Sequence, residues 1–378
     1  MQDRRASEAP FGYWQLPAVE LQKLIDTLAS EGYCVLGPRV KDEVVCIDEL
    51  SQVSQLPQGV ASNQRGGQYR ITHSDDPRYF AFHHGADSWK PYLFPSRRLL
   101  FELGADLIAT SNHSPRPAPM AFFGVRACDL TALQIKARVF ADNDPGYLET
   151  LKSSFVVGVH CQSAADTCFC PSTGSGPEFT SPAFLDLLLT EVLDQKEHYF
   201  VVAAFSERGA TLIQQLSLAA ATDHHRKQVN VQLRNTRAQI KTTLPGNTRA
   251  LLTEHPNAVH WDDVAQRCLA CGNCTAVCPT CFCSDVEDHT DLTAQTAQRW
   301  QVWDSCFNQG HSHTHAGTVR ENTRARYRQW LTHKLSTWYD QFDTSGCTGC
   351  GRCTTWCPVG IDLTVEVAAI ADEVTNGH

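Results

Sequence analysis

The chain has 378 residues, 17 cysteines and a formal net charge of −9. This length suffices for two domains with cores of their own, since domains usually run to about 100–200 residues. The acidic balance argues against a nucleic-acid-binding surface, which is usually strongly basic. No apolar run approaches the roughly 18 residues that a transmembrane helix needs, so a membrane role would require a partner.

The first residues, MQDRRASEAP, carry two arginines that no apolar stretch follows, so they do not predict an export signal. In a chain that stays in the cell, this many cysteines indicate metal ligands rather than disulfides. We therefore expect a cytoplasmic redox protein.

Residues 1–255 alternate between helix-like and strand-like segments, as is typical of an α/β domain. Short apolar runs predict strands at 33–37, 44–48, 120–125, 154–160 and 198–205. Helical spacing of apolar residues predicts helices at 17–30, 131–140 and 183–194, and a mostly helical stretch over 209–242. These elements predict a parallel or mixed sheet with helices against it.

Four cysteines follow the predicted strands of this first domain. Cys128 comes after FFGVRA, Cys161 after SFVVGVH, and Cys168 and Cys170 lie in TCFC just beyond. The ends of neighbouring parallel strands meet at one sheet edge, where such folds bind their ligands. Four sulfurs there would suffice for a third four-iron cluster or for a zinc ion. The alternative is a set of inert core thiols in a cysteine-rich protein.

The pattern Cys-x-x-Cys-Gly-x-Cys-Thr-x-x-Cys-Pro occurs twice, as CLACGNCTAVCP and CTGCGRCTTWCP. Iron–sulfur clusters take thiolate ligands, and bacterial ferredoxins space them in this way. In such pairs the fourth cysteine of each run binds the cluster of the other run. The predicted ligands of one [4Fe-4S] cluster are Cys268, Cys271, Cys274 and Cys357, and those of the second are Cys347, Cys350, Cys353 and Cys278. Zinc is the alternative, but zinc sites usually place two ligands, a spacer and then two more.

A long insertion separates the two runs, and its residues 321–342 predict a helix. We therefore expect residues 256–378 to form an α-helical dicluster domain of ferredoxin type. Three further thiols lie between the runs, at Cys281, Cys283 and Cys306. They either complete an additional metal centre with another group or are buried thiols beside the first cluster.

Other functional signals are weak. The basic, aromatic stretch at 319–334 indicates a solvated helix over anionic clusters or a docking face, rather than a nucleic-acid site. The histidines at 311–315 indicate a polar surface loop more than a metal site. The chain has no dinucleotide or P-loop motif, and no nucleophile pairs with a base, so we predict no catalytic residue and expect a flavin or NAD(P) site on another subunit.

The order of these motifs resembles one family of redox subunits. The resemblance is carried by GGQYRIT at 66–72, DSWKPYLFP at 87–95, FGVRACDLTAL at 123–133 and DTCFCPSTGSGP at 166–177. It continues through RCLACGNCTAVCPTCFC, RWQVWDSC and GCTGCGRCTTWCP. The chain is similar to the iron–sulfur beta subunit of cytoplasmic NAD(P)-linked nickel–iron hydrogenases (sulfhydrogenases), and to the electron-transfer subunit of anaerobic sulfite reductase.

This resemblance implies an electron-transfer subunit in a hetero-oligomer. It would relay electrons between a flavin subunit that handles NAD(P)H and a catalytic subunit, which is a nickel–iron hydrogenase or, in the second relative, a siroheme sulfite reductase. The GP after TCFC and the segment DSWKPYLFP favour the hydrogenase. Two other functions stay open, a stand-alone reductase of sulfur compounds that uses Cys128, Cys161, Cys168 and Cys170, and a regulatory iron–sulfur or zinc sensor.

Overall fold

The computed structural model describes residues 9–104, 109–110, 118–194, 197–293 and 295–377. The two arginines near the start of the chain, which we do not expect to belong to an export signal, lie outside the described residues. Among the helices that are described, none has the length and apolar character needed to cross a bilayer.

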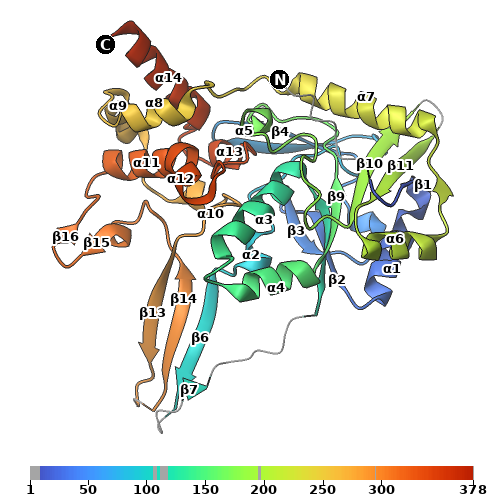
Figure 1. The fold of residues 1–378 in the computed structure, drawn as a ribbon, viewed down its shortest axis with the longest axis horizontal. Coiled ribbons are helices and arrows are strands. Elements are labelled where there is room, and N and C mark those ends of the chain that lie inside the picture. The colour runs from blue at the N-terminus through green and yellow to red at the C-terminus, as the bar shows by residue number, and fades with distance from the viewer. Residues whose placement is uncertain (1–8, 105–108, 111–117, 195–196, 294, 378) are drawn as a thin grey trace.

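An eight-stranded mixed sheet forms the centre of the first domain, in the order β12-β1-β11-β10-β9-β8-β2-β3 (Figure 1). Its interior strands β2, β8, β9 and β10 pair in parallel, and the outer strands pair antiparallel. The strands are β1 Tyr13–Pro17, β2 Cys34–Lys41, β3 Val44–Glu49, β8 Met120–Val125, β9 Phe155–Val159, β10 Leu187–Leu193, β11 His198–Ala204 and β12 Ala219–Ala220.

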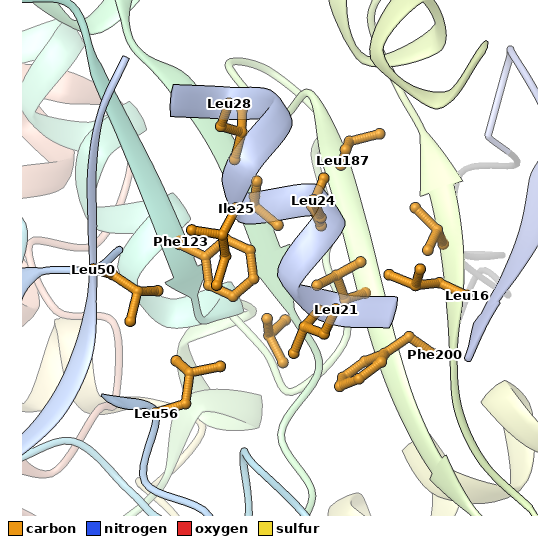
Figure 2. Close-up of a cluster of buried hydrophobic side chains, with 14 of the residues drawn as sticks. Leu16, Leu21, Leu24, Ile25, Leu28, Leu50, Leu56, Phe123, Leu187 and Phe200 are labelled. Atoms are coloured by element: carbon orange, nitrogen blue, oxygen red, sulfur yellow. The ribbon is translucent and has the colours of Figure 1, made fainter. Parts of the chain in front are cut away.

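Helices cover both faces of this sheet, which confirms the expected α/β architecture. On one face lie α1 (Leu21–Ser30) and α6 (Glu207–Leu216), and on the other lie α3 (Ala127–Phe140), α4 (Pro145–Ser153) and α7 (Asp223–Gln239). Figure 2 shows the apolar stripe of α1 packed against the sheet. Its leucines and isoleucine recur at helical spacing and are fully buried, so each contributes about 1.5–3 kcal/mol of hydrophobic stabilisation. The stripe consists of Leu21, Leu24, Ile25 and Leu28.

The helix predicted at 183–194 is wrong, because residues Leu187–Leu193 form the central strand β10. Leu187 and Leu189 pack in the core beneath α1, whereas Leu188 packs in the core beneath α3. A strand buried on both faces carries apolar residues on both, so its pattern can be mistaken for that of a buried helix.

A second sheet joins the two halves of the sequence. It has the order β13-β14-β6-β7, with β6 at Arg97–Leu103, β7 at Ala109–Thr110, β13 at Ser284–Thr290 and β14 at Ala297–Trp303. Figure 1 shows this sheet as an arm that extends from the molecule. The expectation of an all-helical second domain is therefore wrong, because part of the insertion pairs with a strand of the first half. The division near residue 255 stays a prediction.

Outside this sheet, the chain beyond residue 247 is mostly helical, apart from two short strands. It contains α8 Thr248–Glu254, α9 His260–Arg267, α10 Asn273–Ala276, α11 Thr323–Thr332, a π-helical turn at His333–Thr337, α12 Trp338–Phe342, α13 Arg352–Thr355 and α14 Leu363–Asn376. Trp261, Leu331 and Val367 lie at the centre of its core. The remaining short elements are β4 Val60–Arg65, β5 Gln68–His73, α2 Lys90–Leu93, α5 Cys170–Thr173, β15 His313–Thr314 and β16 Gly317–Thr318.

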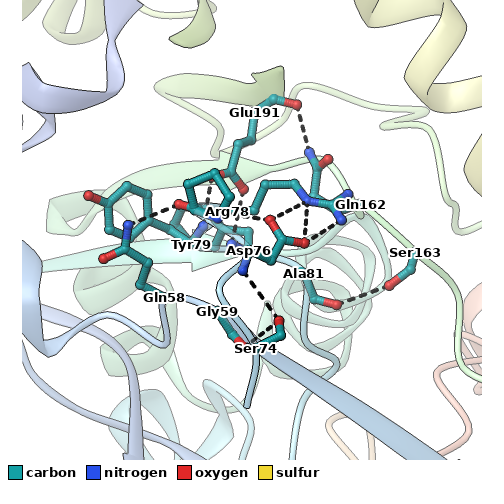
Figure 3. A network of polar contacts seen from close by, with 12 residues as sticks. Gln58, Gly59, Ser74, Asp76, Arg78, Tyr79, Ala81, Gln162, Ser163 and Glu191 are labelled. Carbon is teal, nitrogen blue, oxygen red and sulfur yellow. Dashed lines mark hydrogen bonds and ion pairs between the residues drawn. The ribbon is translucent and has the colours of Figure 1, made fainter. Parts of the chain in front are cut away.

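A buried polar network fixes the loop that crosses the carboxyl ends of the parallel strands (Figure 3). The Glu191 carboxylate on β10 accepts hydrogen bonds from the backbone N–H groups of Tyr79 at 2.7 Å and Phe80 at 3.0 Å. Ser163 donates to the carbonyl of Ala81 at 3.0 Å. The loop and the segment that follows Cys161 are thereby held together at this edge.

Candidate metal centres

Both cysteine runs use the same backbone turn. Gly272 (φ +78°) precedes α10 and Gly351 (φ +73°) precedes α13. Only glycine adopts this left-handed conformation without steric cost, which explains the Gly after the second cysteine of each run. The turn starts a short helix that carries the third cysteine and folds the run around a common centre.

The first run meets the last cysteine of the second run. Cys268, Cys271, Cys274 and Cys357 line one cavity together with Cys353, and aromatic side chains such as Tyr327 and Trp330 form its walls. Burial raises the pKa of the Cys274 thiol well above its ordinary value, and the neighbouring Cys268 and Cys357 thiolates raise it further. This arrangement favours the crossed ligand set, which stays a prediction.

The second quartet shows the reciprocal arrangement. Burial raises the pKa of Cys353 well above its ordinary value, with further increases from the charges of Cys347, Cys350 and Cys278. Cys278 belongs to the first run, so the last cysteine of each run lies near the cysteines of the other run, as the predicted crossed ligand set requires.

A buried lysine lies against this second quartet. Lys334 extends from the π-helical turn and is 3% exposed. Its ammonium group donates hydrogen bonds to Cys278 Sγ at 3.2 Å, Thr280 Oγ1 at 3.0 Å and the Gly346 carbonyl at 3.0 Å. Burial alone would lower the pKa of Lys334, but the thiolates of Cys278 and its neighbours raise it well above its ordinary value. The charge of Lys334 is therefore matched to an anionic sulfur site.

The spacing of the sulfur atoms distinguishes a cluster from a single metal ion. Among the described residues, His260, Asp263 and Glu366 have ligand atoms that all lie within 4.8 Å of one another. No group of three described side chains that includes a cysteine comes this close. One zinc ion draws its ligands close together, whereas a four-iron cluster holds each thiolate on a different iron. The clusters in the two quartets stay a prediction.

The four cysteines of the first domain also come together. Burial raises the pKa of Cys170, and the charges of Cys168, Cys161 and Cys350 raise it further. Burial likewise raises the pKa of Cys128, with Asp129 and then Cys350 as the next contributions. Burial raises the pKa of Cys168 to about 12. The group predicted at the sheet edge therefore lies beside Cys350 of the second quartet.

The loop with Cys168 and Cys170 packs directly on the second cysteine run. The Phe169 N–H donates to the Gly349 carbonyl at 2.9 Å. A Cβ atom on Gly349 would lie 2.5 Å from the backbone nitrogen of Cys170. Ala270 occupies the equivalent position of the first run, also with positive φ. The close contact with Cys170 therefore explains why position 349 is a glycine.

Buried arginines accompany the same group. Arg126 donates to the carbonyls of His160 at 2.9 Å and Phe80 at 3.0 Å. Arg352 pairs with Asp129 at 2.9 Å, and Asp129 also contacts His84 Nε2 at 2.7 Å. Both guanidinium groups lower the pKa of nearby thiols, Arg126 that of Cys161 and Arg352 that of Cys128, although burial raises both. They offset part of the negative charge that bound thiolates would bring.

The three thiols between the runs lie together at a different cavity. Cys281, Cys283 and Cys306 line it with His311 and Lys334. His311 hydrogen-bonds the Asp304 carboxylate and is not simply part of a polar surface loop, whereas His313 and His315 are exposed.

Comparison with known proteins agrees with this geometry. The family described as "4Fe-4S dicluster domain" matches residues 267–361. The chain is also 31% identical to the sulfhydrogenase 2 subunit beta of Pyrococcus furiosus over 261 residues, which cover 68% of this chain and 74% of that protein. It belongs to the sulfhydrogenase beta-subunit family. The resemblance seen in the sequence is thus confirmed, and this family member is an iron–sulfur protein of an oxidoreductase family. No solved structure matches the chain.

The sequence segments that indicated the family surround the cysteines. The Gly67 N–H donates to the Thr354 carbonyl at 3.1 Å, and Tyr69 stacks on Trp356 with ring centroids 5.3 Å apart. Lys90 lies 3.7 Å above the Trp303 ring and donates to the Ala276 carbonyl at 2.9 Å. These family motifs therefore build the walls of the two cysteine runs.

Sequence reasoning missed the buried cations. Lys334 was counted with a basic stretch that we expected to be solvated, yet Tyr327, Trp330 and Leu331 of the same stretch are also buried. The signal for its burial was the alternation of these apolar residues with the basic ones at helical spacing.

Proposed function

We propose that this chain is the electron-transfer subunit of a hetero-oligomeric oxidoreductase, with one [4Fe-4S] cluster in each crossed quartet. The observation that supports the proposal is that the last cysteine of each run lies among the cysteines of the other run. Bound clusters of this type would supply one-electron redox steps, and their exchanged ligands would keep them close together.

The chain itself would set the environment of these clusters. Lys334 donates to Cys278 Sγ, and Tyr327 and Trp330 line the first quartet, in which Cys271 is exposed. Hydrogen bonds to sulfur and solvent exposure are two of the factors that set cluster potentials. The two quartets differ in both, which supports different potentials for the two sites.

The proposal includes a third cluster at Cys128, Cys161, Cys168 and Cys170. Its support is the mutual proximity of these four cysteines, of which Cys170 is buried and the others are half-buried, and the two arginines whose charges act on them. Since Cys350 lies beside this group, the third site would extend the electron path from the second quartet to the edge of the large sheet.

The partners we propose are a flavin subunit that handles NAD(P)H and a catalytic subunit, in the cytoplasm. The relative from Pyrococcus furiosus is named as a sulfhydrogenase subunit, and this favours a nickel–iron hydrogenase over a siroheme sulfite reductase as the catalytic partner. Tagged chain isolated anaerobically from its own cells should bring down a flavoprotein and a nickel-containing subunit. Recovery of a siroheme protein in their place would select the sulfite reductase.

Iron and acid-labile sulfide per chain, with EPR of the reduced state, test the cofactor content. About twelve of each are expected for three clusters, and about eight would remove the third site while leaving the relay in place. Stoichiometric zinc without sulfide would overturn the proposal. The purified chain alone should not turn over sulfite or polysulfide with a reduced dye, and turnover without partners would identify a stand-alone reductase.

A further inference from the structure

Cys283 and Cys306 form a close pair outside both quartets. Cys283 ends the segment before β13, and its carbonyl accepts a hydrogen bond from the Asp304 N–H at 2.9 Å, just after β14. The pairing of these two strands therefore brings Cys306 near Cys283, and both side chains line the same cavity. Both are half-buried.

The environment of the pair shifts the pKa values of the two thiols in opposite directions. Hydrogen bonding from the Cys306 thiol, followed by the positive charge of His311, lowers the pKa of Cys283 to about 6 although burial opposes this. The hydrogen bond to the Cys283 thiolate, together with burial, raises the pKa of Cys306. The lowered pKa favours the thiolate form of Cys283, and the raised pKa favours the protonated form of Cys306. This asymmetry is what thiol–disulfide exchange requires of an attacking and a resolving cysteine.

The pair opens to a cavity of about 410 Å³, a size typical of small-molecule sites. Among the described residues, its lining contains basic side chains and lacks aspartate and glutamate. The basic residues are His311, Arg320, His333 and Lys334. Burial lowers the pKa of His333, His311 bonds Asp304 and Lys334 bonds Cys278, so Arg320 is the charge that faces a ligand. The Arg320 Nε is buried and has no hydrogen-bond partner in the described part of the chain. The cavity therefore suits an anionic ligand.

We propose that Cys283 and Cys306 are a redox-active dithiol that reduces low-molecular-weight disulfides bearing carboxylate groups, bound in this cavity. The Cys283 thiolate attacks one sulfur of the ligand, so that a mixed disulfide forms and one thiolate leaves. Cys306 then loses its proton and attacks Cys283 Sγ, which releases the second thiol and leaves a Cys283–Cys306 disulfide. Two electrons and two protons restore the dithiol, and only this return step depends on the electron-transfer role proposed above.

The exchange is tested on the full chain, purified anaerobically, reduced with dithiothreitol and then freed of it. The probe is 3,3′-dithiodipropionate, and cystamine, a cationic disulfide, is the matched control. We expect two equivalents of 3-mercaptopropionate per chain and a Cys283–Cys306 disulfide in the peptide mass spectrum. Cystamine should react several-fold more slowly, and Arg320→Gln should reduce this difference.

Single substitutions separate the two roles. Cys306→Ser should stop at a mixed disulfide on Cys283, with one equivalent released, and Cys283→Ser should release none. Cys46→Ser, in the first sheet, should behave as the unchanged chain. The inference is overturned if both thiols stay free or if both resist alkylation because they bind a metal. Iron content measured on the same samples tests the cluster proposal separately. The dithiol inference can therefore fail while the cluster proposal holds, and the reverse.

Discussion

Lys334 offers the most direct test of how the chain controls its second quartet. Its ammonium nitrogen lies 3.2 Å from Cys278 Sγ, and at an effective dielectric constant of about 20 a full unit charge on that sulfur would interact with it by about 5 kcal/mol. An added electron is shared by four ligands, so roughly a quarter of this, about 1.3 kcal/mol, acts on reduction. For a one-electron couple this corresponds to about 60 mV.

Lys334→Met should therefore lower the midpoint potential of the cluster in the second quartet by about 60 mV, because a positive charge that favours reduction is removed. An EPR-monitored redox titration measures this shift. Lys334→Arg, which keeps the charge, should recover most of it. Lys136→Met is the matched control, because that buried lysine lies 4.2 Å from the Phe94 ring centroid and does not bond a cysteine. A shift below about 10 mV, or an equal shift of both clusters, would refute the reasoning.

Three further predictions concern single residues. Cys357→Ser should remove the cluster of the first run, measured as a loss of about four irons per chain with the second EPR signal intact. Gly349→Ala should lower the melting temperature, because its Cβ would lie 2.5 Å from the Cys170 nitrogen, and a cost of about 1–3 kcal/mol is typical of such overpacking. Iodoacetamide should label Cys283 above its pKa of about 6, and labelling should decline as the pH falls through 6 because the thiolate takes up a proton.

Each of these has a control. Loss of the second EPR signal alone in Cys357→Ser would contradict the crossed ligands. Ala270→Gly, at the matching position of the first run, should change the melting temperature much less than Gly349→Ala. The groups that face Cys283 are Cys281, Cys306, His311 and Lys334, so His311→Gln should move the labelling midpoint upward. A midpoint near the ordinary thiol value in the unchanged chain would contradict the lowered pKa.

The cysteine runs were readable from the sequence because their chemistry depends on local spacing. Gly272 and Gly351 stand where the turn needs a left-handed residue, and the fourth cysteine of each run follows from the same pattern. The gathering of Cys128 and Cys170 was also anticipated, since both follow parallel strands that end at one sheet edge. These inferences needed only the periodicity of the chain and the topology of α/β sheets.

Features that depend on contacts between residues far apart in the sequence could not be predicted from it. The run from Leu187 to Leu193 carries leucines on both faces and is buried on both, so its pattern alone did not separate a strand from a helix. The pairing of Trp300 on β14 with Leu99 on β6 joins residues about two hundred positions apart, and no local signal announces it. The burial of Lys334 depends in the same way on Cys278 and Gly346, which approach it only in the folded chain.

The pairing of β14 with β6 bears on how this protein can be divided. A fragment that begins near residue 256 would retain β13 and β14 but lose β6, so β14 would present an unpaired edge. Exposed edges of this kind pair with other chains and promote aggregation. The same cut would also remove the loop that packs on Gly349. The dicluster region is therefore not a transferable module, and fusions or transplants of this subunit should keep the whole chain.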